Sequence, residues 1–82
     1  MSFNINLPMS EIVLFTSITN KIMSEVWLNN GERKINAKSI LGIHSVDFNE
    51  PILLLSVGYN LSDSDKNYLK EIKERWGVAN EN

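Results

Sequence analysis

The stretch VWLNNGERKINA, residues 26–37, decides the fold of this 82-residue chain. At its centre, Asn30-Gly31 is the strongest short signal for a β-hairpin, because a type I′ turn needs positive φ at both central residues. The apolar residues on either side recur with a period of two: Val26, Leu28, Ile35 and Ala37. Side chains of a strand alternate between its faces, so these four are expected to share one buried face of a strand pair.

Two other segments have the character of strands. Apolar side chains alternate with asparagines over residues 3–7, and Pro8 ends this segment because proline cannot donate a hydrogen bond to a strand ladder. Residues 52–57 are nearly all apolar and are flanked by turn-forming residues, which favours a central strand over a helix. With the hairpin, these segments predict a four-stranded antiparallel sheet.

Two segments between the strands have helical spacing of apolar residues. The first helix is expected to begin at Ser10 as its N-cap, with Glu11 favoured in the first turn by the helix dipole, and to end near Lys21. The second is a short helix over residues 40–45, capped by Ser39 and weakened by an internal glycine.

The last helix has the clearest pattern. Ser62 is expected to cap it, and Asp65 to complete a capping box. The charged residues of this helix, Asp65 included, are expected to be solvated. Ion pairs are expected four residues apart, as Lys70 with Glu74 and Glu71 with Arg75. The element order is therefore βαββαβα, an α+β domain with its helices on one face of the sheet.

Composition excludes several classes of function. The length suits one domain, expected over residues 1–78 and followed by a short flexible tail at 79–82. The absence of cysteine suits the cytoplasm, the net charge of −2 disfavours nucleic acid, and no apolar run is long enough for a membrane span. His44 has only Asp47 as a near carboxylate, so no metal or other cofactor is expected, and the chain is expected not to be an enzyme.

The run Ile35-Asn36-Ala37-Lys38-Ser39-Ile40-Leu41-Gly42-Ile43 resembles a segment of HPr, the phosphocarrier protein of the sugar phosphotransferase system. Gram-positive members of that family carry a similar hydrophobic-Asn-Ala/Leu-Lys-Ser-Ile-Met-Gly run at the same place. The likeness is fairly specific over residues 24–46 and looser elsewhere. It implies an open-faced sandwich, with three helices on one side of a four-stranded sheet whose spatial order is first, fourth, second, third.

The resemblance also implies a lost activity. Between the first strand and first helix, the family has a loop of the type Gly-Leu-His-Ala-Arg-Pro, whose histidine receives phosphate from phosphoenolpyruvate and whose arginine helps to hold it. The corresponding segment here is the shorter Leu7-Pro8-Met9-Ser10, which has neither residue. Transfer through a phosphohistidine at that site is therefore not expected, because the imidazole nucleophile is missing.

Ser39 falls on the family's regulatory serine, which a kinase phosphorylates so that the protein binds a transcription regulator of carbon use. By itself the position indicates only an N-cap, although a phosphate there would meet free N–H groups at a positive helix end. The resemblance implies a degenerate HPr-like protein that is regulatory or protein-binding and is controlled at Ser39. Its partner would be a regulator, a kinase or a second copy, docking on the short helix through Ile40, Leu41, Ile43 and His44.

The sheet face away from the helices is a second candidate surface. If the hairpin residues above face the helices, Trp27 faces away from them, and Ile52 and Leu54 lie outward beside it. An exposed apolar patch with a tryptophan is typical of an interface, most simply with a second copy in a homodimer. Alternatively, Trp27 lies over Leu54 and the side chain of Arg33 and shields the patch within one monomer.

Two other functions remain open on the sequence. One is a structural or oligomerisation module with no phosphate chemistry. The other is a phosphocarrier with a non-standard acceptor, for which His44 is the only available imidazole.

Overall fold

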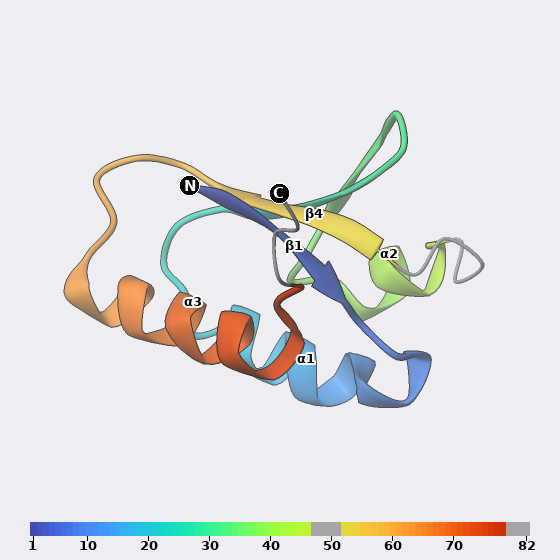
Figure 1. Cartoon of the computed structure of the whole chain (residues 1–82), viewed down its shortest axis with the longest axis horizontal. Coiled ribbons are helices and arrows are strands. Elements are labelled where there is room, and N and C mark those ends of the chain that lie inside the picture. Colours follow the sequence, from blue (N-terminus) through green and yellow to red (C-terminus); the bar gives the residue numbers. More distant parts are fainter. Residues whose placement is uncertain (47–51, 79–82) are drawn as a thin grey trace.

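The computed structural model describes residues 1–46 and 52–78, so the tail expected at 79–82 lies outside the described residues. The elements are β1 (Ser2–Asn6), a 3-10 turn η1 (Met9–Glu11), α1 (Ile12–Thr19), β2 (Val26–Asn30), β3 (Arg33–Asn36), α2 (Ile40–His44), β4 (Ile52–Val57) and α3 (Asp63–Trp76). The strands form one antiparallel sheet in the order β1-β4-β2-β3, and α1 and α3 lie along one face of it (Figure 1). The expected α+β class and antiparallel sheet are confirmed, and the strand order is the expected one.

The hairpin forms, but its turn is one residue further along than predicted. Asn30 pairs with Arg33, which leaves Gly31 and Glu32 as the two turn residues. Gly31 has a φ of 64°, whereas Asn30 is not among the residues with positive φ. Glycine first with positive φ is the pattern of a type II′ turn, which matches the strand twist as well as type I′ does.

The strand register puts the predicted residues on the buried face. Leu28 lies opposite Leu55 on one side and Ile35 on the other, and all three are buried. The outward residues of β4 are Ile52, Leu54 and Ser56, of which the two apolar ones are 48% and 39% exposed. The predicted division of the sheet into an inner and an outer face is therefore confirmed.

The first helix begins differently from the prediction, which placed Ser10 as its N-cap. The N–H of Glu11 donates to the carbonyl of Pro8 at 3.0 Å, so the chain already turns at Ser10 and lacks the extended backbone of an N-cap. Glu11 precedes α1 and makes no side-chain cap. Its Oε1 instead accepts a hydrogen bond from Trp76 Nε1 at 2.9 Å, which ties α1 to the end of α3.

The core fills the space between the sheet and the helices. Phe15 and Trp76 meet edge to face with ring centroids 5.2 Å apart, joining α1 to α3. Ile43 brings α2 into the same cluster. Three polar contacts then hold the ends of the connections: Thr19 Oγ1 donates to Ala37 O, Lys38 Nζ to Ile22 O, and Arg33 Nη1 to Ser45 O.

Asp65 is buried, which corrects the expectation that it is solvated. It is 1% exposed, and its carboxylate accepts hydrogen bonds from Met23 N at 2.9 Å, Ser24 N at 3.2 Å and Ser24 Oγ at 3.0 Å. Ser62 Oγ accepts from Asp65 N, which confirms the predicted cap. The carboxylate therefore joins α3 to the connection after α1, and the reciprocal half of a capping box is replaced by a tertiary contact.

The two expected ion pairs of α3 have different outcomes. Arg75 Nε lies 3.2 Å from Glu71 Oε2, so that pair is confirmed. Within residues 1–46 and 52–78 no other ion pair forms, and the expected Lys70–Glu74 pair is wrong. Lys70 and Glu74 are both exposed. Water solvates each charge there, and an exposed ion pair would add little to stability.

We expect Asp65→Asn to destabilise the fold at neutral pH and to lose this effect in acid. The hydrogen bond from Met23 N–H is the largest cause that lowers the pKa of Asp65 below 3.8; burial opposes it, and the Ser24 bonds add to it. Its stabilisation is therefore present above the unfolded-state pKa and lost as the pH falls through the lower folded-state pKa.

Urea unfolding of both proteins from about pH 7 to about pH 2 checks this, because the two free energies of unfolding should converge in acid. Asp63→Asn, at an exposed carboxylate in the same helical turn, is the matched control. A difference that persists at the lowest pH would contradict the role given to the charged carboxylate.

Candidate functional site

Ser39 caps α2, as the sequence predicts. It has extended backbone angles (φ −102°, ψ 114°), and its Oγ accepts a hydrogen bond from Gly42 N at 3.0 Å. The residue as a whole is half-buried. The cap is confirmed, and modification of Ser39 stays a prediction.

The residues proposed for docking on α2 do not share one face. Leu41 is 84% exposed, and Ile40 and His44 are also exposed. Ile43 is fully buried, so its assignment as a docking residue is wrong. Positions two apart on a helix point roughly 200° away from each other, so an exposed Leu41 puts Ile43 against the core.

Arg33 holds the far end of α2. Its Nη1 and Nη2 donate to the backbone oxygen and the Oγ of Ser45 at 2.8 and 2.9 Å. Arg33 is therefore not placed over Trp27, as the shielding alternative expects.

The segment that corresponds to the phosphohistidine loop, residues 7–10, connects β1 to α1. Leu7 is buried, and Met9 and Ser10 are exposed in the 3-10 turn that leads into α1. The carboxylate of Glu11 lies at the start of α1, where a helix would otherwise favour an incoming anion. This end of the helix therefore has no nucleophilic imidazole, no arginine and an unfavourable charge for phosphate.

The open sheet face is more polar around Trp27 than expected. Trp27 is half-buried, lies opposite Ser56, and carries Lys34 Nζ 4.5 Å above its ring centroid. A shallow pocket of about 450 Å³ opens beside it and reaches Ser24 and Glu25. Trp27 is therefore partly covered within the monomer by Lys34, and the exposed apolar surface of this face is mainly that of β4.

A second concave surface was not predicted from the sequence. It lies between the first residues of β1 and α3, and it has a volume of about 200 Å³. Three lysines contribute to its lining: Lys66, Lys70 and Lys73. Their spacing of four and three residues is a signal for one face of a helix, but it identifies a groove only once β1 is known to lie alongside.

The described part of the chain offers no metal centre and no membrane helix. Within residues 1–46 and 52–78, no three histidine, cysteine, aspartate or glutamate side chains are grouped to hold a metal ion. Asp47, the carboxylate nearest to His44 in sequence, lies outside these residues. No described helix is long and apolar enough to cross a bilayer.

Comparison with protein-family models finds none that matches this chain. Comparison with curated proteins likewise finds no match.

We expect the chain to take no acid-labile phosphate from phosphoenolpyruvate in the presence of the general enzyme of the phosphotransferase system. The reason is the missing imidazole and arginine at the start of α1. Intact-mass measurement checks this, with an authentic HPr as the positive control. One acid-labile phosphate, present in the wild type and lost in His44→Gln, would instead establish a phosphocarrier with a non-standard acceptor.

Proposed function

We propose that this chain is a non-enzymatic, HPr-like protein-binding domain whose docking surface is the exposed side of α2 and is controlled by phosphorylation of Ser39. One observation carries the proposal: a half-buried serine caps a short helix that presents an exposed apolar side chain, Leu41, two residues later. Ile40 and His44 extend this surface. The matching strand order and the resemblance around Ser39 support the same conclusion.

A phosphate on Ser39 would change this surface chemically. It would add close to two negative charges and several acceptor oxygens beside the first N–H groups of α2. The adjacent Lys38 already donates to the carbonyl of Ile22 at 2.6 Å, so the new phosphate would compete for that ammonium group. The modification would therefore alter both the charge beside Leu41 and the contact that holds the preceding turn.

We expect an ATP-dependent serine kinase of the HPr type to add one acid-stable phosphate at Ser39. Phosphopeptide mapping should locate it there, and Ser39→Ala should abolish it. Ser45→Ala, at the exposed serine on the other end of α2, is the control and should remain a substrate. Ser39→Ala also removes the cap, at a cost of about 1 kcal/mol in stability.

Ser39→Asp should reproduce only part of the effect, because a carboxylate has less charge and fewer acceptor oxygens than a phosphate. A chain that stays unmodified, or a phosphate mapped to Ser45 or Ser62, would contradict the assignment.

Self-association through the open sheet face is a second candidate, favoured by the exposure of Ile52 and Leu54 in a central strand. Apolar side chains there have no covering layer among the described residues, and a second copy would remove them from water. Trp27, under Lys34, would lie at the margin of that contact.

We expect light scattering to detect a dimer of the wild type at high concentration and only a monomer for Leu54→Asn. Leu41→Asn removes an equally apolar exposed side chain from α2 and should leave the dimer unchanged. A wild type that stays monomeric at high concentration would show that this face is not a self-association surface.

A further inference from the structure

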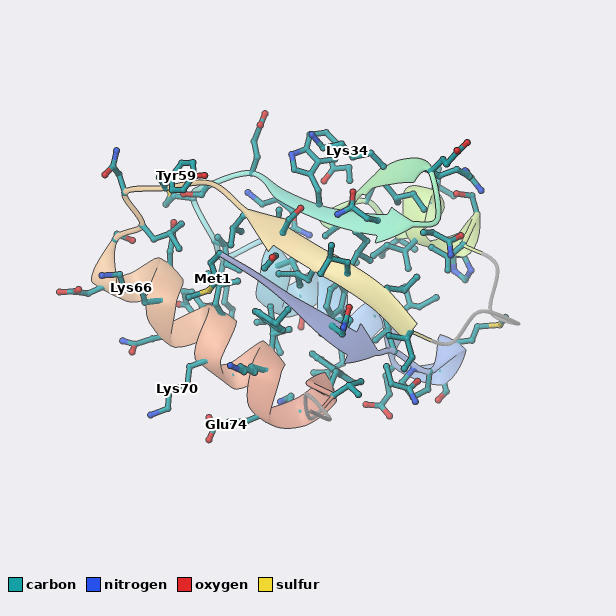
Figure 2. The ribbon with its side chains drawn as sticks, turned by 45° about the horizontal axis from the view of Figure 1, so that its top comes forward. Met1, Lys34, Tyr59, Lys66, Lys70 and Glu74 are labelled. Atoms are coloured by element: carbon teal, nitrogen blue, oxygen red, sulfur yellow. The ribbon has the colours of Figure 1, made fainter. Side chains whose placement is uncertain are left out.

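The groove between β1 and α3 has an apolar floor and a basic rim. We call its apolar lining residues, Met1, Phe3 and Leu69, the floor, and its lysines, Lys66, Lys70 and Lys73, the rim. Lys66 and Lys70 project from α3, and Met1 lies alongside at the start of β1 (Figure 2). β1 is one edge of the sheet and β3, which contacts α2, is the other. The groove is therefore at the opposite sheet edge from Ser39.

The lysines of this groove have no anionic partner within the described residues. Their spacing places three like charges on one face of α3, which destabilises an isolated helix. The ion pair on this helix joins Arg75 to Glu71 instead, and Lys73 Nζ lies 5.7 Å from the ring centroid of Phe3. No carboxylate lines the groove. Positive charge is thus concentrated here in a chain whose net charge is −2.

The size of the groove limits what can occupy it. Pockets for whole small-molecule ligands are typically about 300–1,000 Å³, and this one is about 200 Å³. That volume suits a single large apolar side chain, against which the aliphatic stems of the lysines can pack while their ammonium groups stay in water. Charge and size together therefore favour an apolar anchor that is flanked by anions.

We propose that this groove binds an acidic peptide segment of a partner protein, with one apolar side chain on the floor and flanking carboxylates paired with the lysines. A short peptide can contact the groove alone. A membrane or a nucleic-acid backbone extends further and would also meet Glu71 and Glu74 on the same helix, which would repel it. The pairs are exposed, so the binding is modest and sensitive to salt. The proposal does not depend on Ser39 or α2.

Fluorescence anisotropy with a fluorescein-labelled Glu-Glu-Phe-Glu-Glu peptide tests the proposal. The wild type should bind saturably, and affinity should fall when ionic strength rises from about 0.01 M to about 0.1 M. Lys66→Gln with Lys70→Gln should weaken binding about tenfold, whereas Lys21→Gln with Lys34→Gln should change it less than about twofold. The control pair removes the same amount of charge at lysines that do not line the groove, one over the ring of Tyr68 and one over that of Trp27.

Two further measurements locate the contact. Replacing the phenylalanine of the peptide by alanine should weaken binding, and amide chemical shifts should move at residues 1–3 and 66–73. Equal losses in the two double variants, or shifts confined to α2 or the open sheet face, would overturn the proposal. Lysine-dependent binding to phosphatidylserine vesicles with no binding of the peptide would assign the groove to a lipid surface and would also overturn it.

Discussion

The pairing of β4 with two strands at once is the constraint on which the rest of the structure depends. Leu55 lies opposite Phe3 of β1 and Leu28 of β2, and it is fully buried at the centre of the sheet. A slip of one residue would exchange the faces of β4, moving Leu55 outward and Leu54 inward. The inward side chains of β1, β4 and β2 must face the core together. One register of β4 therefore fits both neighbouring strands, and β4 fixes the positions of β1 and β2.

The helices are positioned by that sheet more than by their own propensities. α1 has only eight residues, several of them β-branched, and such a helix is marginal in water without tertiary packing. Phe15 secures it against Trp76, whose indole N–H also reaches Glu11. Asp65 joins the start of α3 to the connection after α1. The helices are thus held by packing on the apolar face of the sheet and by polar contacts between segments that are distant in sequence.

The candidate surfaces lie on separate parts of this framework. α2 packs near β3, the lysine groove lies at β1, and the exposed apolar residues of β4 are on the face away from the helices. In Figure 2, Lys34 lies above the sheet, whereas Lys66 and Lys70 lie on α3. A substitution at one surface therefore changes a different set of contacts from a substitution at another, and an effect at one does not require an effect elsewhere.

The sequence by itself determined the element order, the inner and outer faces of the strands, and the caps at Ser39 and Ser62. Those features follow from the local periodicity of apolar residues and from side chains that hydrogen-bond to nearby backbone groups. Both depend only on residues that are close in sequence. The resemblance to HPr also supplied the strand order in advance. Local patterns could not show the start of α1, because Ser10 is a favourable cap by type and is displaced by the turn that Pro8 begins.

Only the tertiary structure decided which of the charged and apolar helix residues are buried and which are exposed. Asp65 belongs to a helix face that looks solvated in sequence, yet Met23 and Ser24 surround its carboxylate. Ile43 and Leu41 are equally apolar, and the direction in which α2 meets the core buries one and exposes the other. The lysines of α3 line a groove only because β1 lies beside that helix in the folded chain. Burial, hydrogen bonding and concavity depend on segments brought together by folding, and spacing along one segment does not contain that information.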